Sequence, residues 1–308
     1  MNIQMTTQNK ANPFFYDHDQ TIVKFGCEGN IFNLSSLKTF DRPIISHGFA
    51  IKFVHDGIER YTINNKSYSI TPGSYLLLNG EKEGKVEIES SKNVKGLCLN
   101  VSNELISEVV ATIRTPDTAV SDPELSRFFY TDHFLENQYS SVHTQLGTQL
   151  REISKHITNY AFSSNQINPE LFYLLAESLV ADQLQVFKQL QSIPSVKPET
   201  RRELCRRILN GKAFIDSNYT ESITIEQIAR IAGMSEYHFF RLFKQTIGCT
   251  PYQYVLSNRL NKASQLLKSD YQVSDVAVLM GFSDIHSFSK AFKKQFGLSP
   301  TLYASSRT

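Results

Sequence analysis

Two stretches near the C-terminus share one pattern of residues, and this duplication constrains the fold more than any other feature of the chain. Three residue pairs lie 48 positions apart, namely Ala229 and Ala277, Gly233 and Gly281, and Ser235 and Ser283. After one extra residue in the second copy, five more pairs lie 49 positions apart, namely Arg241 and Lys290, Phe243 and Phe292, Lys244 and Lys293, Gly248 and Gly297, and Pro251 and Pro300. A repeated unit of this length predicts one surface that is built twice.

Local rules predict a helix, a tight turn and a second helix within each copy. Gly233 and Gly281 each follow a short helix, where a left-handed turn favours glycine. Ser235 and Ser283 stand where a hydroxyl caps the next helix. Phenylalanines at i and i+4 of that second helix are expected to face the core, namely Phe239 and Phe243 in the first copy and Phe288 and Phe292 in the second. This is the geometry of a helix-turn-helix, whose second helix enters the major groove of DNA.

The opposite side of each second helix carries the residues that are free to point outward. They are Tyr237, Phe240, Arg241 and Lys244 in the first copy, and Ile285, His286, Ser289, Lys290 and Lys293 in the second. Arginine can read guanine through two hydrogen bonds, and apolar side chains can touch the methyl group of thymine. One such side chain is equally well explained as ordinary surface, but two matching faces on equivalent helices favour DNA contact.

The duplicated region resembles the AraC/XylS family of transcription regulators. The resemblance rests on IEQIARIAGMSEYHFFRLFKQTIGCTPYQY, on VSDVAVLMGFSDIHSFSKAFKKQFGLSPTLY and on Arg259 to Leu267 of the connecting helix, and it covers about residues 203–304. It implies two helix-turn-helix units joined by a long helix, which read adjacent major-groove segments on one face of promoter DNA. By position it implies base contacts from Tyr237, Phe240, Arg241, Ile285, His286, Ser287, Ser289 and Lys290. We expect phosphate contacts from Lys212, Lys244, Lys262 and Lys293.

The charge distribution agrees with a partner of negative charge at the C-terminal end. Residues 1–196 hold 16 Lys and Arg against 21 Asp and Glu, a net charge of −5, whereas residues 197–308 hold 16 against 9, a net charge of +7. A basic region of this size is the expected footprint of nucleic-acid binding. The modest excess favours sequence-specific duplex binding over an architectural protein, and no aromatic strand pattern of an RNA-binding module occurs.

The N-terminal region reads as strands separated by turns. Apolar alternation and turn residues recur at short intervals over 51–79, as in Asp56-Gly57, Asn64-Asn65 and Pro72-Gly73. A small barrel or sandwich is therefore predicted over 21–102, and it resembles the cupin-like sensor domains of the same family. We expect its interior to bind a small-molecule effector among inward aromatics, namely Phe53, Tyr61 and Tyr75. Plain core packing is the alternative for these three rings.

The remaining boundaries follow from composition and periodicity. We predict a flexible arm over 1–20, a helical segment over 103–191, a linker over 192–198 that holds two prolines, and an all-helical DNA-binding domain over 199–308. The apolar stripe within 169–190 is either intramolecular core or a dimer contact. Helices in the last domain are expected at about 199–217, 224–232, 236–247, 251–268, 273–280, 284–296 and from 300.

An enzyme is the alternative function. Cupin barrels often bind a metal through an HxH pair with a further acid and histidine, and this chain has His47, His55 and Glu59 but no HxH pair. Four scattered cysteines form no CxxC pair, and no nucleotide-binding or hydrolase motif occurs with the right flanks. The alternative is therefore a cupin-type metal-dependent enzyme fused to a DNA-binding domain. We expect no catalysis, no cofactor and no metal.

Together these patterns predict an α+β multidomain protein with a cupin-like β-barrel, a helical segment and a C-terminal domain of two helix-turn-helix units. The predicted function is sequence-specific transcription regulation under the control of a small molecule bound at the N-terminal domain. We expect a cytoplasmic protein because no membrane segment or signal peptide is apparent. The expected partners are double-stranded promoter DNA, an effector, a second copy of the chain, and RNA polymerase if the protein is an activator.

Overall fold

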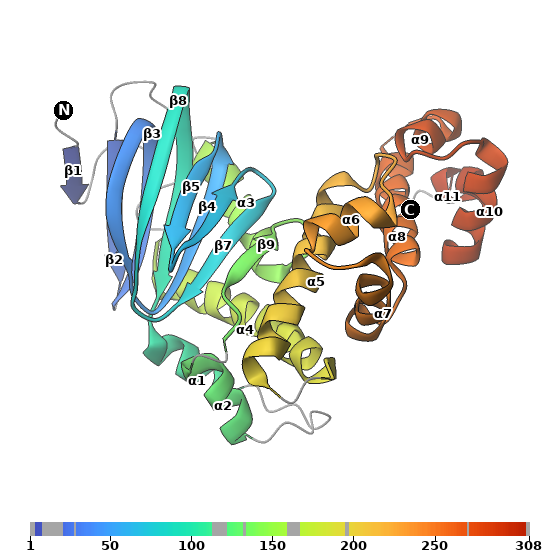
Figure 1. Cartoon of the computed structure of the whole chain (residues 1–308). Helices are drawn as coiled ribbons and strands as arrows, with labels where there is room; N and C mark the ends of the chain where they lie inside the picture. The colour runs from blue at the N-terminus through green and yellow to red at the C-terminus, as the bar shows by residue number, and fades with distance from the viewer. Residues whose placement is uncertain are drawn as a thin grey trace. The chain divides into compact units, whose positions relative to one another are not determined.

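The computed structural model describes residues 4–7, 21–27, 29–112, 122–131, 134–158, 167–194, 197–269 and 271–305. They divide into two compact units, Met1–Lys188 and Gln189–Thr308. The first holds a sheet with helices, and the second is wholly helical in its described residues (Figure 1). This is the predicted fold class. Within the described residues, no helix is long and apolar enough to cross a membrane.

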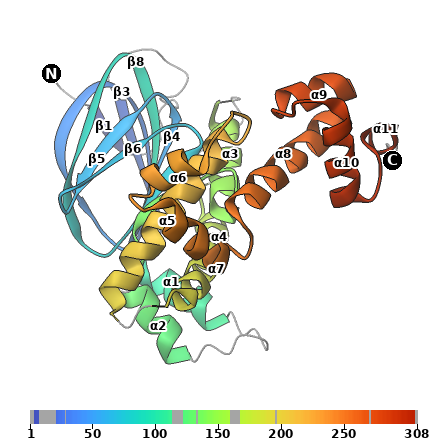
Figure 2. The same cartoon turned by 45° about the vertical axis from the view of Figure 1, so that its right-hand side comes forward.

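The first unit is built on one antiparallel sheet that curls into a nearly closed barrel (Figures 1 and 2). Its strands run in the order β1-β2-β3-β8-β4-β7-β9, with β5 paired to both β6 and β8. The strands are β1 (Gln4–Thr7), β2 (Thr21–Cys27), β3 (Asn30–Ser46), β4 (Phe49–Asp56), β5 (Glu59–Ile63), β6 (Lys66–Ile70), β7 (Ser74–Asn79), β8 (Lys82–Val101) and β9 (Asn137–Ser140). Among the strands that the structure describes, only β1 and β2 pair in parallel. The rest of the arm expected over 1–20 lies outside the described residues.

The long strand β8 holds the barrel together because three strands pair with it along its length. Its first half pairs with the end of β3 and with β5, and its second half pairs with the start of β3 and with β4. The tight turns lie at the residues predicted from the sequence, such as Gly57, Asn64 and Gly73. Asn64 and Asn65 have φ angles of 47° and 62°, the left-handed conformation that a two-residue hairpin between β5 and β6 requires.

Both faces of the sheet are buried at the strands β4 and β7. One face forms a cluster inside the barrel from residues such as Ala50, Val54, Leu76 and Leu78. The other lies under four helices, α1 (Asn103–Thr112), α2 (Asp122–Tyr130), α3 (Gln145–Thr158) and α4 (Pro169–Ser192). Phe49, for example, packs edge-on against Phe129 of α2 and against Phe134. The segment predicted to be helical over 103–191 therefore also contains one strand, β9, which pairs with β7 at the end of the sheet.

The second unit contains seven helices in its described part. They are α5 (Pro198–Asn218), α6 (Ile225–Ile231), α7 (Glu236–Ile247), α8 (Pro251–Lys268), α9 (Val273–Leu279), α10 (Ile285–Phe296) and α11 (Pro300–Ser305). Each lies within two residues of its predicted bounds. The division between the two compact units falls after Lys188, within α4. The linker expected over 192–198 remains a prediction.

Each copy of the repeat has a core of its own. In the first, Phe239 and Phe243 of α7 are wholly buried with Ile208 of α5 and Val255 of α8. In the second, Phe288 and Phe292 of α10 are buried in the same way against α8 and α9. The helices α5 and α8 are equivalent, so the repeat begins earlier than the motifs indicate. At a spacing of 52, Arg207 matches Arg259, Ile208 matches Leu260, Gly211 matches Ala263 and Ile215 matches Leu267.

Gly211 has no room for a side chain, and this generates a prediction. A Cβ there would lie 2.5 Å from Cε2 of Phe239. An alanine in a helix interior ordinarily stabilises relative to glycine. We expect Gly211→Ala instead to lower the free energy of unfolding by about 1–3 kcal/mol, because Phe239 must move. Urea denaturation measures the change, with Asn210→Ala as the control. An increase in stability would contradict this packing.

Candidate DNA interface

The two helix-turn-helix units have the same backbone path but different caps. Gly233 and Gly281 have φ angles of 63° and 68°, as predicted for the turns. Ser235 precedes α7 but makes no side-chain capping bond. In the second helix-turn-helix unit Asp284 is the capping residue, because its carboxylate accepts the Ser287 N–H at 2.7 Å. The prediction that Ser235 and Ser283 cap these helices by their hydroxyls is therefore wrong. Asp284 is a stronger acceptor than the neighbouring hydroxyl and displaces it.

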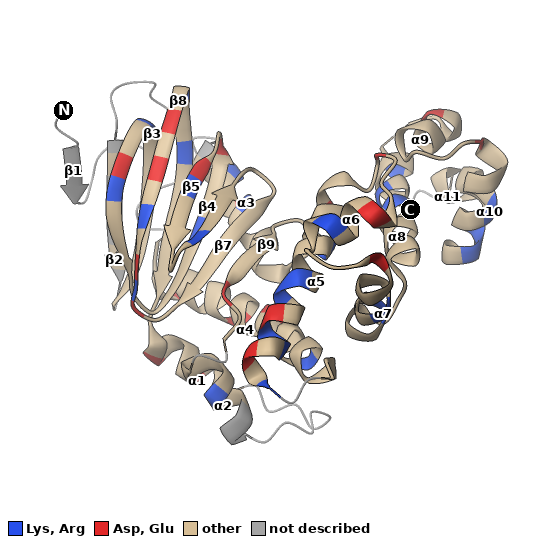
Figure 3. Ribbon diagram, viewed as in Figure 1, with Lys and Arg blue, Asp and Glu red and all other residues tan. Residues whose placement is uncertain are grey.

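The residues predicted to face bases lie on the solvent side of α7 and α10. Tyr237 is 77% exposed, Phe240 is 42% exposed and Ile285 is 41% exposed. Arg241, His286, Ser287 and Lys290 are also exposed, and Ser289 is half-buried. The Ser287 hydroxyl donates to Asp284 at 2.7 Å, so this side chain serves the cap. Basic residues gather on α10, as Figure 3 shows. Base contact by these eight residues remains a prediction.

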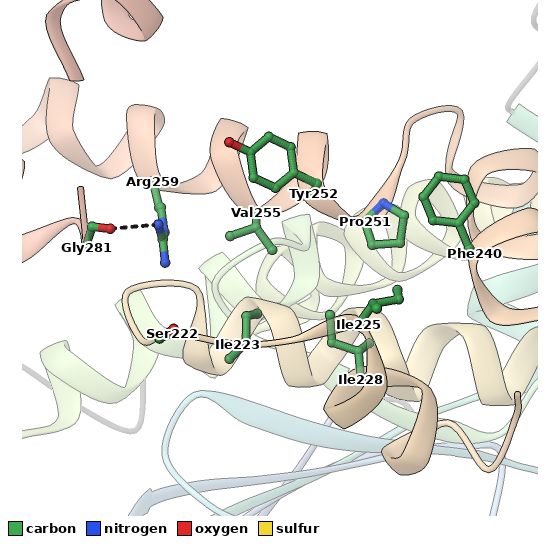
Figure 4. Close-up of a pocket in the computed structure, with 10 residues that line it drawn as sticks. All are labelled: Ser222, Ile223, Ile225, Ile228, Phe240, Pro251, Tyr252, Val255, Arg259 and Gly281. Atoms are coloured by element: carbon green, nitrogen blue, oxygen red, sulfur yellow. Dashed lines mark hydrogen bonds between the residues drawn. The ribbon is translucent and has the colours of Figure 1, made fainter. Parts of the chain in front are cut away.

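Phe240 also borders an apolar pocket in the C-terminal compact unit, Gln189–Thr308. The pocket has a volume of about 440 Å³ and lies between α6 and the start of α8. Isoleucines line it on one side, and Phe240, Pro251, Tyr252 and Val255 line it from the other side (Figure 4). The ring of Phe240 therefore has apolar neighbours within its own unit.

Three of the four lysines predicted to contact phosphates are exposed, namely Lys244, Lys262 and Lys293. Lys212 is different. Its ammonium group forms an ion pair with Asp216 at 2.9 Å and lies 5.2 Å from the ring centre of Tyr254. The buried Asp216 also accepts hydrogen bonds from the Tyr254 hydroxyl and from Asn258, both on α8. Lys212 thus belongs to a polar cluster that joins α5 to α8, and the prediction of a phosphate role for it is wrong.

Sequence reasoning missed two arginines that bind the turns. Arg207 of α5 donates to the Gly233 carbonyl at 3.0 Å, and Arg259 of α8 donates to the Gly281 carbonyl at 3.0 Å. Each arginine therefore holds the turn of its own unit from the preceding helix. The spacing of 52 between them was the available signal. It differs from 48 because, after its arginine, α8 ends two residues earlier than α5 does, and the connection that follows is two residues shorter.

A separate cavity of about 340 Å³ lies on the inner face of the barrel. Its polar lining includes Lys52, whose ammonium donates to Cys98 Sγ at 2.6 Å, and Glu59, which accepts from the Tyr61 hydroxyl at 2.5 Å. Burial raises the pKa of Glu59. The Oδ1 atom of Asn33, which also lines the cavity, is buried and has no hydrogen-bond partner among the residues described. The rest of the lining is largely aliphatic, with Phe40.

Only one of the three aromatics predicted to line this interior does so. Tyr61 lines the cavity. Phe53 and Tyr75 pair across β4 and β7 and lie on the outer face, where Tyr75 stacks on Tyr139 of β9. Strand alternation places these two rings outside, because their neighbours Val54 and Leu76 occupy the interior.

The three residues considered for a cupin metal site do not share one set of contacts. His55 is hydrogen-bonded to Ser154 of α3 at 2.6 Å, whereas Glu59 and His47 line the cavity. Among the described residues, no group of three or more His, Cys, Asp or Glu side chains could hold a metal ion.

Comparison with known proteins matches the repeated region to one family model and to several regulators. Residues 228–306 match a model described as a helix-turn-helix domain. The HTH-type regulator YbfI of Bacillus subtilis is 26% identical over 77% of each chain. The probable regulator LumQ of Photobacterium leiognathi is 40% identical, but the match spans only 29% of this chain and 37% of LumQ. The probable transcription factor PqrA of Proteus vulgaris is 37% identical over 29% of this chain and 73% of its own length.

The cap of α10 yields a pH-dependent prediction. Hydrogen bonds from the backbone and hydroxyl of Ser287 hold the pKa of Asp284 at about 2, below its ordinary 3.8. A depressed pKa contributes stability above the unfolded value, and this contribution is lost as the pH falls toward the folded value. We expect Asp284→Ala to melt at a lower temperature than the original chain at neutral pH. The difference should shrink as the pH falls from 3.8 to about 2. A difference that is constant with pH would contradict the charged cap.

Proposed function

The chain belongs to the AraC/XylS family of transcription regulators, and from that premise we propose that it reads two neighbouring major-groove segments of promoter DNA through α7 and α10. The observation that carries this proposal is the matched pair of recognition helices. Each buries two phenylalanines at i and i+4 and leaves basic and polar side chains exposed on the other side. Phosphate contacts from Lys244, Lys262 and Lys293 position the unit, and the recognition faces select the sequence.

We propose that the barrel cavity binds the effector. Lys52 offers ammonium hydrogens, and Asn33 offers an acceptor atom, so the cavity suits a compact polar molecule with both donor and acceptor groups. The aliphatic lining accommodates its apolar side. A ligand that binds one arrangement of the N-terminal compact unit better than another would shift the population of chains that can bind DNA.

The remaining partners follow from the same proposal. A DNA-binding regulator of this kind acts in the cytoplasm without a chemical step of its own. Two copies of the chain would contact each other through their N-terminal compact units. RNA polymerase would be the partner at promoters that the protein activates. Sedimentation of the full chain with and without promoter DNA reads the number of copies directly.

The base-reading role of Arg241 has a specific expected outcome. If its guanidinium makes a bidentate contact with a base, Arg241→Ala costs about 1–3 kcal/mol of binding free energy and relaxes specificity at one base pair. Lys244→Ala, one turn further along α7, weakens binding to all sequences alike and lowers the salt slope by about one. Titrations against a duplex that the full chain selects from a random pool measure both effects.

The matched control for these titrations is Lys38→Ala, which changes an exposed lysine of the N-terminal compact unit. It leaves affinity and specificity unchanged. Unchanged binding and unchanged sequence preference in Arg241→Ala would remove the base contact from this residue.

The effector proposal is tested at Lys52. We expect at least one compound in a panel of small sugars, carboxylates and amines to raise the melting temperature of the full chain. Lys52→Met should lose that shift because the variant lacks the ammonium donor, while Lys38→Met, at an exposed site, keeps it. A compound that stabilises the chain and Lys52→Met equally would place its site elsewhere, and a panel without any shift would contradict the sensor.

A further inference from the structure

We propose that Arg259 fixes the distance and angle between the two recognition helices, and thereby the spacing between the two DNA segments that the chain accepts. This inference rests on the proposed DNA-binding function. It concerns a positioning residue, because Arg259 acts on the placement of α7 and α10 and its guanidinium binds backbone carbonyls.

Arg259 joins the two helix-turn-helix units through three hydrogen bonds. Its Nε donates to the Tyr219 carbonyl at 2.5 Å, and its Nη2 donates to the Glu221 carbonyl at 2.8 Å. Both carbonyls lie in the connection between α5 and α6, within the first helix-turn-helix unit. Its Nη1 donates to the Gly281 carbonyl at 3.0 Å, in the turn of the second unit (Figure 4). One rigid planar group therefore binds both units at once.

Gly281 shows how closely the two units meet at this point. A Cβ there would lie 2.7 Å from the Thr220 carbonyl oxygen and 3.1 Å from Nη2 of Arg259. The equivalent Gly233 of the first unit has nothing within 4 Å of the same position. Both glycines have a positive φ, so their backbone requirement is the same. Only Gly281 has the additional requirement of close contact between the units.

Arg207 is the natural comparison for Arg259. It occupies the equivalent position on α5 and binds the turn of its own unit at Gly233. Its Nε also donates to Glu203, one turn away on α5 itself. Arg207 thus holds a turn within one unit, whereas Arg259 holds a turn and also links two units.

The consequence for DNA follows from the geometry of α8. This helix of 18 residues connects the units and is about 27 Å long at 1.5 Å per residue. Figures 1 and 2 show it extending from α7 to α9. A change of one base pair between two binding segments moves one of them along the duplex and also rotates it about the axis, since B-DNA turns once in about 10 base pairs. A clamped pair of units accepts one spacing, whereas units that can turn about α8 accept several.

The experiment measures spacing preference with the full chain. A duplex selected from a random pool supplies the two segments, and variants of it carry one base pair less or more between them. We expect the original chain to prefer the selected spacing. Arg259→Lys should lose this preference because an ammonium group cannot bridge three carbonyls in a plane, while its affinity for a duplex with one intact segment is retained. Arg207→Lys should keep the preference.

A second pair of variants keeps the test informative if Arg259→Lys does not fold. Gly233→Ala and Gly281→Ala impose the same strain at a positive φ, but only Gly281→Ala pushes the two units apart. We expect Gly281→Ala to shift or broaden the accepted spacing and Gly233→Ala to leave it unchanged.

The outcomes separate this inference from the proposed function. A chain that binds no duplex in preference to random DNA fails the proposed function. A chain that binds specifically, but whose spacing preference is the same in Arg259→Lys or, where that variant does not fold, in Gly281→Ala, overturns the role of Arg259 alone.

Discussion

The burial of two phenylalanines on one side of each recognition helix is the interaction on which the DNA-binding unit depends. Phe239, Phe243, Phe288 and Phe292 are all 0% exposed. Burying a side chain of this size contributes about 1.5–3 kcal/mol relative to leaving it in water. Because successive residues of a helix are rotated by a constant angle, holding these rings in the core also fixes which side chains point outward. The polar face of α7 and of α10 is therefore a consequence of core packing.

Much of the second unit could be predicted from the sequence, because its signals are local. A glycine in a left-handed turn and an apolar i, i+4 pair depend on neighbouring residues, and both placed the helices within two residues. Predictions that depended on distant partners failed. Lys212 and Asp216 lie one turn apart on α5, but their burial depends on Tyr254 and Asn258 of α8, which are 38 and 42 positions from Asp216. The three carbonyls bound by Arg259 come from segments up to 40 positions away, which no local pattern indicates.

The barrel illustrates a different limit. Alternation of residues predicted the strands, but it could not say which face is the interior. In an isolated sheet, the polar face would mark the outside. Here helices cover the outer face, so Phe53 and Tyr75 are as deeply buried outside the barrel as Val54 and Leu76 are inside it. The charged residues Lys52 and Glu59 lie inside and are buried in the fold.

The most direct measurement of the central claim is a hydroxyl-radical footprint of the full chain on a duplex that it selects. Two matched units that read adjacent grooves predict two protected patches on one face of the DNA, about 10 base pairs apart. A single patch, or protection spread evenly around the duplex, would contradict the claim that α7 and α10 act as a pair.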